Sequence, residues 1–161
     1  MIVHGGQNDR NTVSRLFQWY HVDNATWTAF NADRKLNEIS VVPALMHATA
    51  IYDASRDRML IFGGDSDAGS QYMDQALSYS IGSNYFSYLT TSSDGGGIGR
   101  MLHSAVLVGD MVVLLGGYNA DACASHDLVV YSVLANRFLK DKVAVFNDKS
   151  IRSHCTRKGK E

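Results

Sequence analysis

The sequence predicts an all-β fold built from repeated modules of four antiparallel strands. Three observations support this prediction. The 161-residue chain contains 14 glycines and one proline, and polar turns separate its short apolar runs. A glycine pair ends an apolar run at three places along the chain. A tyrosine and a second large aromatic residue follow each pair at nearly constant spacing, which indicates an internal repeat.

The repeat unit places glycine pairs and aromatic residues in a fixed order. Successive pairs begin 58 and 53 residues apart, and a tyrosine follows 15 or 16 residues after the first glycine. A second aromatic residue lies seven positions beyond each tyrosine. The three sets are Gly5, Gly6, Tyr20 and Trp27; Gly63, Gly64, Tyr79 and Phe86; and Gly116, Gly117, Tyr131 and Phe138.

Each repeat predicts four strands in the same order. The first strand is the apolar run that follows a histidine, His47 or His103, and we interpret these two histidines as equivalent. The second strand ends at the glycine pair, the third carries the tyrosine, and the fourth begins at the second aromatic residue. Gly109-Asp110 separates two apolar runs and predicts a tight primed hairpin turn, whereas Asp53–Arg58 makes the same connection with a longer polar loop.

This pattern resembles the kelch repeat, in which one repeat forms one four-stranded blade of a β-propeller. The resemblance covers roughly residues 1–140. It implies blades at about residues 1–30 (lacking the first strand), 44–90 and 100–140. It also implies that the glycine pairs, the aromatic residues and the two histidines serve packing. In the third repeat an arginine, Arg100, precedes the histidine by three positions, and Ala44 stands there in the second repeat.

Three blades fall short of the roughly four to eight that close a propeller, so we expect an incomplete propeller. One interpretation is a fragment of a larger propeller, in which residues 141–161 are a basic tail or the start of a truncated next repeat. The other is a short protein that self-associates through open blade edges. Because repeat units cannot bury their faces alone, we expect a marginally stable or aggregation-prone monomer.

The loops on one side of the blades are the predicted binding surface. Strands alternate in direction, so the long loops after the second strands emerge on the same side as the connections between blades. Binding residues concentrate on loops that a rigid scaffold holds. The candidate binding residues on this side are Arg10, Arg34, Asp65, Tyr72, Arg100 and Tyr118.

Composition and motifs argue against several other functions. A net charge of −1 does not suit a general nucleic-acid binder, and no apolar run approaches a membrane span of about 20 residues. The six histidines and two cysteines show no metal-ligand spacing. Neither a phosphate-binding loop nor a nucleophile elbow occurs. We therefore expect no metal, no cofactor and no catalytic residue.

The resemblance implies a protein–protein interaction module or scaffold that binds a protein partner. Two alternatives stay open: a fragment of a kelch-like carbohydrate-active enzyme, of the sugar oxidase or epimerase type, and a non-functional truncated product. The low cysteine count favours the cytoplasm. If a larger parent protein is secreted, the sequon Asn24-Ala25-Thr26 could carry a glycan.

Overall fold

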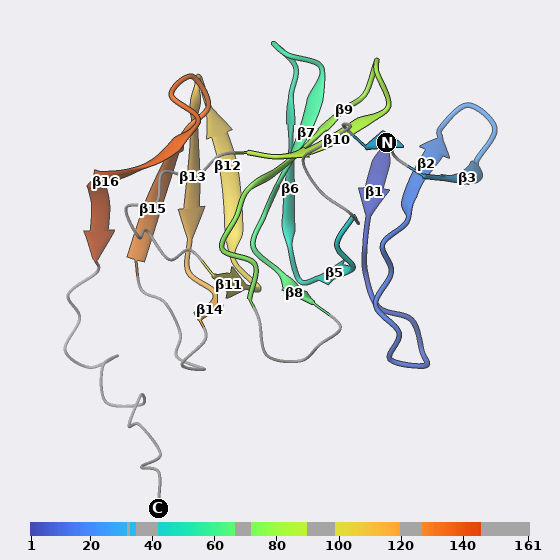
Figure 1. The fold of residues 1–161 in the computed structure, drawn as a ribbon, viewed down its shortest axis with the longest axis horizontal. Coiled ribbons are helices and arrows are strands. Elements are labelled where there is room, and N and C mark those ends of the chain that lie inside the picture. Colours follow the sequence, from blue (N-terminus) through green and yellow to red (C-terminus); the bar gives the residue numbers. More distant parts are fainter. Residues whose placement is uncertain (32, 35–41, 67–71, 90–98, 120–126, 146–161) are drawn as a thin grey trace, which may run out of the picture.

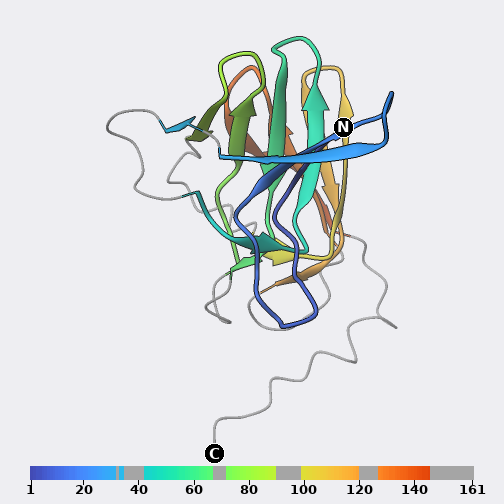
Figure 2. The same ribbon diagram turned by 90° about the vertical axis from the view of Figure 1, so that its right-hand side faces the viewer.

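The computed structural model describes residues 1–31, 33–34, 42–66, 72–89, 99–119 and 127–145, and this part of the chain holds strands and turns without any helix. Three antiparallel sheets stand side by side (Figures 1 and 2). Blade 1 contains β1 (Ile2–His4), β2 (Phe17–His21) and β3 (Thr26–Phe30). Blade 2 contains β6 (Thr49–Asp53), β7 (Arg58–Phe62), β9 (Leu77–Ser80) and β10 (Tyr85–Tyr88). Blade 3 contains β12 (Ser104–Val108), β13 (Met111–Leu115), β15 (Asp127–Ser132) and β16 (Arg137–Val145).

The all-β prediction is confirmed, and the strand order inside the blades follows the chain. Neighbours run β6-β7-β9-β10 in blade 2 and β12-β13-β15-β16 in blade 3, all antiparallel. Val108 pairs with Met111 across the turn between β12 and β13. Gly109 has φ +58° there and Asp110 does not have a positive φ, which is the pattern of a II′ turn.

Several short pairings lie outside the four strands that the repeat predicts for each blade. β5 (Leu45–Met46) pairs with β8 (Asp65–Ser66), and β11 (Arg100–Met101) pairs with β14 (Tyr118–Asn119). β4 (Asp33–Arg34) runs parallel to the first residues of β10. β16 also continues past residue 140 to Val145, where it pairs with Asp127. Two-residue strands carry too little alternation to be recognised in a sequence.

The proposed equivalence of His47 and His103 is wrong by one residue. Phe62 and Leu115, which directly precede the glycine pairs, pair with Thr49 and Ser104, so Ala48 is the counterpart of His103. His47 is exposed, with φ +57°, and Leu102 has the same φ at the matching position of blade 3. Because both residues are histidines, the sequence suggested an equivalence that is one position out of register.

In the same way, Leu45 rather than Ala44 is the counterpart of Arg100. The carbonyl oxygen of Leu45 accepts a hydrogen bond from Gly6 N at 2.7 Å, and that of Arg100 accepts one from Gly64 N at 2.8 Å. A backbone hydrogen bond at the same position of the repeat therefore joins blade 1 to blade 2 and blade 2 to blade 3.

Aromatic residues fill the space between neighbouring blades. Tyr79 and Phe86 of blade 2 pack on Phe17 of blade 1, with ring centroids 4.5 Å and 6.4 Å from it. Tyr131 and Phe138 of blade 3 pack on Phe62 of blade 2 at 5.3 Å and 6.4 Å. Each tyrosine and its aromatic partner thus face the preceding blade, and burial of these rings is a large apolar contribution to the fold.

Trp27 differs from its counterparts in the other two blades. Its side chain is 52% exposed, whereas Phe86 and Phe138 are 3% and 9% exposed. Trp27 packs on Tyr20 of its own blade, with ring centroids 4.8 Å apart. In the described part of the chain no blade lies against this side of blade 1, so the ring stays in contact with solvent.

The tyrosines of blades 2 and 3 have a second function in the hairpin that follows them. Tyr79 donates a hydrogen bond to Asn84 Oδ1 at 2.9 Å, and Tyr131 donates one to Asn136 Oδ1. Asn84 and Asn136 have φ +52° and +51°, a conformation that asparagine tolerates better than most residues. Blade 1 places Ala25 at this position with φ +53°.

Replacing Ala25 by asparagine should therefore stabilise the chain. Asparagine relieves part of the cost of a left-handed backbone and supplies an acceptor for the Tyr20 hydroxyl, so we expect a gain of about 1 kcal/mol. Urea denaturation followed by Trp fluorescence measures it. Asn84→Ala is the matched control and should lose a similar amount, and a neutral or negative Ala25→Asn would contradict this explanation.

Candidate functional site

The two ends of the blades differ in construction (Figure 1). The four-residue and two-residue hairpins lie at one end. The small sheets β5-β8 and β11-β14 and the β1–β2 loop lie at the other. We call this second end the loop face, and it comprises residues 5–16, 45–46, 65–66, 72, 100–101 and 118–119. Much of the predicted binding surface, including residues 67–71, 90–98 and 120–126, lies outside the described residues.

Arg10 and Tyr118 are exposed on the loop face. Arg10 belongs to a turn in which Asn8 Oδ1 accepts hydrogen bonds from the backbone N–H groups of Arg10 and Thr12, at 3.0 Å and 2.9 Å. Tyr118 pairs with Met101 between β14 and β11, and its side chain is 44% exposed. The backbone of both residues is thus fixed while the side chains reach solvent.

Asp65 and Tyr72 are brought together, although six residues separate them in the sequence and five of these are undescribed. They form an antiparallel bridge, and Asp65 also pairs with Met46. A Cβ added to Gly99 would lie 3.3 Å from the carbonyl oxygen of Tyr72. The loop segment of blade 2 therefore touches the chain that enters blade 3, which makes the centre of the loop face continuous.

Arg34 does not join this group. β4 pairs with Tyr85 and Phe86, the residues of β10 nearest the hairpin end of blade 2. The backbone of Arg34 therefore lies on the outer edge of that blade rather than on the loop face. The structure does not describe its side chain.

Arg100 is a buried structural residue, so we withdraw it as a candidate binding residue. Its side chain is 3% exposed. Its guanidinium donates to both carboxylate oxygens of Asp127, at 3.1 Å and 2.9 Å, and to the carbonyl oxygen of Gly116 at 3.1 Å. A bidentate pair of this kind fixes the start of β11 against β15. In the sequence, this arginine is marked only by its position three residues before His103.

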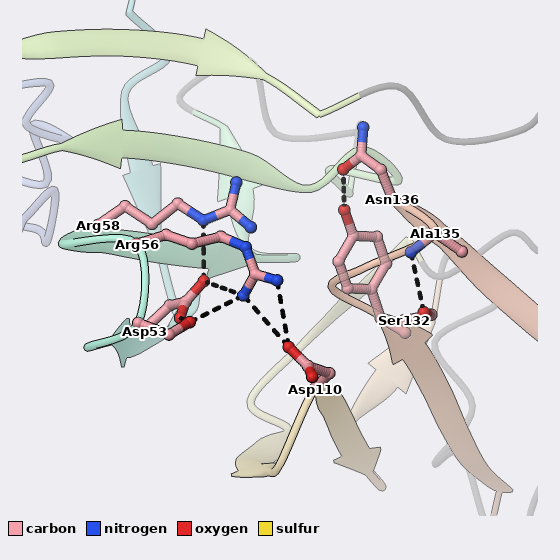
Figure 3. A network of polar contacts seen from close by, with 9 residues as sticks. Asp53, Arg56, Arg58, Asp110, Ser132, Ala135 and Asn136 are labelled. Carbon is pink, nitrogen blue, oxygen red and sulfur yellow. Dashed lines mark hydrogen bonds and ion pairs between the residues drawn. The ribbon is translucent and has the colours of Figure 1, made fainter.

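The hairpin end holds a charge network that the sequence reading did not identify (Figure 3). Asp53, at the end of β6, accepts hydrogen bonds from Ser55 Oγ at 2.6 Å, Arg58 Nε at 3.0 Å and Arg56 Nη1 at 3.2 Å. Arg56 also bonds Asp110 of blade 3 at 3.2 Å. Desolvation would raise the pKa of Asp53, but these hydrogen bonds outweigh it and lower that pKa below its usual value. The network links blades 2 and 3, and its only sequence signal is the charged loop Asp53–Arg58.

A groove of about 550 Å³ separates blades 1 and 2 near the hairpin end. Met1, Ile2 and Trp19 line it from blade 1, and Ala50, Tyr52 and Met59 are among the lining residues from blade 2. It lies beside β1, which is the edge strand of its sheet in the described structure.

Two histidines, half-buried His4 and buried His103, have ring nitrogens that are shielded from water. The His4 ring lies 4.4 Å from the ring of Phe17, and His103 packs against Gly63. Burial lowers the pKa of each to about 4, and the nearby Arg100 charge adds to the effect at His103. Neither ring nitrogen of either residue has a hydrogen-bond partner in the structure. Both side chains are therefore neutral at pH 7.

These histidines should make the fold sensitive to mild acid. Their folded pKa values of about 4 lie below the unfolded value of 6.5, so the unfolded chain binds more protons between these limits. Stability should fall as the pH drops from 6.5 to 4, by about 1–2 kcal/mol per histidine at pH 5. Urea unfolding at pH 7 and pH 5 measures the loss. His103→Ala, which copies Ala48 of blade 2, should reduce this pH dependence, and an unchanged slope would contradict the assignment.

In blades 2 and 3 a tyrosine and a second ring pack on the preceding blade, and this repeated packing is the geometry of a propeller. The family described as Attractin/LZTR1 beta-propeller matches residues 1–160. The chain belongs to this family. The β-propeller resemblance seen in the sequence is confirmed by this match, and the three sheets described above form an incomplete propeller. A search of curated proteins finds no match.

The described part of this Attractin/LZTR1-type propeller shows no group of three or more His, Cys, Asp or Glu residues that could hold a metal ion. Over the same residues, no helix has the length and apolar character needed to cross a membrane.

Proposed function

We propose that the chain is a protein–protein interaction module that binds its partner through the loop face. The observation that carries this proposal is the exposed side chain of Tyr118 on a strand pair that is anchored to the blades. Tyrosine offers a large contact area with little conformational entropy to lose, and it is enriched where binding energy concentrates.

The anchoring of the loop face supports the proposal. Backbone hydrogen bonds from Gly6 to Leu45, from Gly64 to Arg100 and from Leu102 to His47 join successive blades at this end, at 2.7, 2.8 and 3.1 Å. A surface held in this way loses little entropy when it binds a partner. Asp65, Tyr72 and Arg10 add a carboxylate, a second ring and a cation, so both apolar and charged groups are available to a protein surface.

The test compares two tyrosines at opposite ends of the blades. Tyr118 is 44% exposed on the loop face, and Tyr52 is 55% exposed beside the hairpin end. The immobilised chain and its Tyr118→Ala and Tyr52→Ala variants are incubated with a cell extract, and the bound proteins are quantified by mass spectrometry. We expect Tyr118→Ala to lose at least about tenfold of a specific partner, as a hot-spot loss of 1.4 kcal/mol would give, and Tyr52→Ala to retain it. Equal retention by both variants, or loss with Tyr52→Ala alone, would refute the loop face as the binding surface.

A further inference from the structure

Among the described residues, no other blade covers two faces at opposite ends of the row of blades. On blade 1, Met1 and Trp27 are 63% and 52% exposed. With Val3 and Tyr20 they form what we call the aromatic face. On blade 3, the side chains of β12 and β13 that point away from blade 2 form the receiving face. They are Val106, Val108, Met111 and Leu115, which are 55%, 61%, 41% and 46% exposed.

The aromatic face of blade 1 matches a face that is buried elsewhere in the same chain. Tyr20 pairs with Trp27 as Tyr79 pairs with Phe86, and Val3 pairs with Gln18 as Ile61 pairs with Leu77. Hence Met1, Val3, Tyr20 and Trp27 correspond to Met59, Ile61, Tyr79 and Phe86. The latter four are all in the apolar cluster that joins blade 2 to blade 1.

The receiving face of blade 3 likewise matches a buried face of blade 2. Leu115 pairs with Ser104 as Phe62 pairs with Thr49, so Leu115 is the counterpart of Phe62. Phe62 is fully buried beneath Tyr131 and Phe138 of blade 3. Leu115 is therefore at the position that receives the tyrosine and second ring of a following blade.

We propose that a second copy of this chain covers both faces, with the aromatic face of each copy packed on the receiving face of the other. Two such contacts join two sets of three blades into a ring of six, within the roughly four to eight blades of closed propellers. A contact between different faces closes a ring when the rotation per subunit fits, and here each subunit would span half a turn.

The short sheet of blade 1 does not prevent this contact. The interface between blades 1 and 2 already forms with only β1, β2 and β3 on one side, because Phe17 on β2 carries the ring contacts. On the aromatic face these same three strands supply Val3, Tyr20 and Trp27. Gln18 replaces Leu77 there, so the contact between copies is more polar than the one inside the chain, and we expect a dimer that dissociates on dilution.

Sedimentation velocity over a hundredfold concentration range tests the proposal. The wild-type chain should shift from its mass of 17.7 kDa to twice that value. Leu115→Asp and Trp27→Asp should each raise the dissociation constant at least thirtyfold. Val22→Asp and Leu134→Asp are the controls, because these residues are 72% and 71% exposed in hairpin turns off both faces, and they should not change it. Circular dichroism checks that every variant keeps its strands.

Mixing the two face variants identifies which surfaces meet. Chains with Trp27→Asp keep a receiving face, and chains with Leu115→Asp keep an aromatic face. Their mixture should contain more dimer, held by one intact contact, than either variant alone at the same concentration. A monomeric wild type, dimers that only one of the two substitutions disrupts, a mixture without dimers, or open-ended assemblies larger than a dimer would each overturn the six-blade ring.

Discussion

Asp127→Asn should lower the free energy of unfolding by about 3 kcal/mol, and Arg100→Leu should lower it by only about 1 kcal/mol. Both substitutions break the same ion pair, but they leave different groups behind. The Arg100 side chain is 3% exposed, so its charge has no access to water once the carboxylate is gone. The Asp127 side chain is 26% exposed and can be hydrated when the arginine is removed.

Blade 2 shows that an apolar residue fits the position of Arg100. Its counterpart, Leu45, is 1% exposed and belongs to the apolar cluster between blades 1 and 2. The Nε–H of Arg100 is also buried without an acceptor, so Arg100→Leu removes an unsatisfied donor. Urea denaturation of the two single variants and the double variant measures the asymmetry. A larger loss of stability for Arg100→Leu than for Asp127→Asn would contradict this explanation. It would mean that the attraction between the two charges exceeds the cost of removing them from water.

The strands and their order could be predicted because their signals recur. An alternating or continuous apolar run next to a glycine pair is repeated three times, and each recurrence strengthens the others. The register between blades was not predictable in the same way. His47 and His103 are the same residue type one position out of step, and only the pairing of Thr49 and Ser104 with the ends of β7 and β13 separates them.

The candidate site was harder to predict because exposure depends on contacts between distant segments. Arg100 and Arg10 were both expected on the loop side, yet the Arg100 side chain is 3% exposed and is bonded to Asp127, whereas Arg10 is exposed in a turn. Trp27 carries the repeat pattern as faithfully as Phe138 does, but only Phe138 has a preceding blade against it. The sequence predicts which residues are suited to packing, whereas the neighbouring sheet decides which of them are packed.

Gly63→Ala should destabilise the chain by more than about 3 kcal/mol, through a backbone collision rather than through φ alone. A Cβ at Gly63 would lie 2.3 Å from the carbonyl oxygen of Arg100 and 2.7 Å from Cε1 of His103. That carbonyl accepts the hydrogen bond from Gly64 N that joins blade 2 to blade 3. Relief of the collision therefore requires the two blades to move apart. The fraction of soluble folded protein and its urea midpoint measure the effect.

Gly109→Ala is the control that separates conformational strain from close packing. Gly109 has φ +58°, close to the +60° of Gly63, but a Cβ there would meet no atom within 4 Å. Alanine should cost only the left-handed strain of about 1–2 kcal/mol at this turn. If both substitutions cost the same, the first glycine of the pair would be needed for its φ alone. A larger loss at Gly63 means that glycine is needed there because a carbonyl oxygen of the next blade lies against it, as the carbonyl oxygen of Leu45 lies against Gly5.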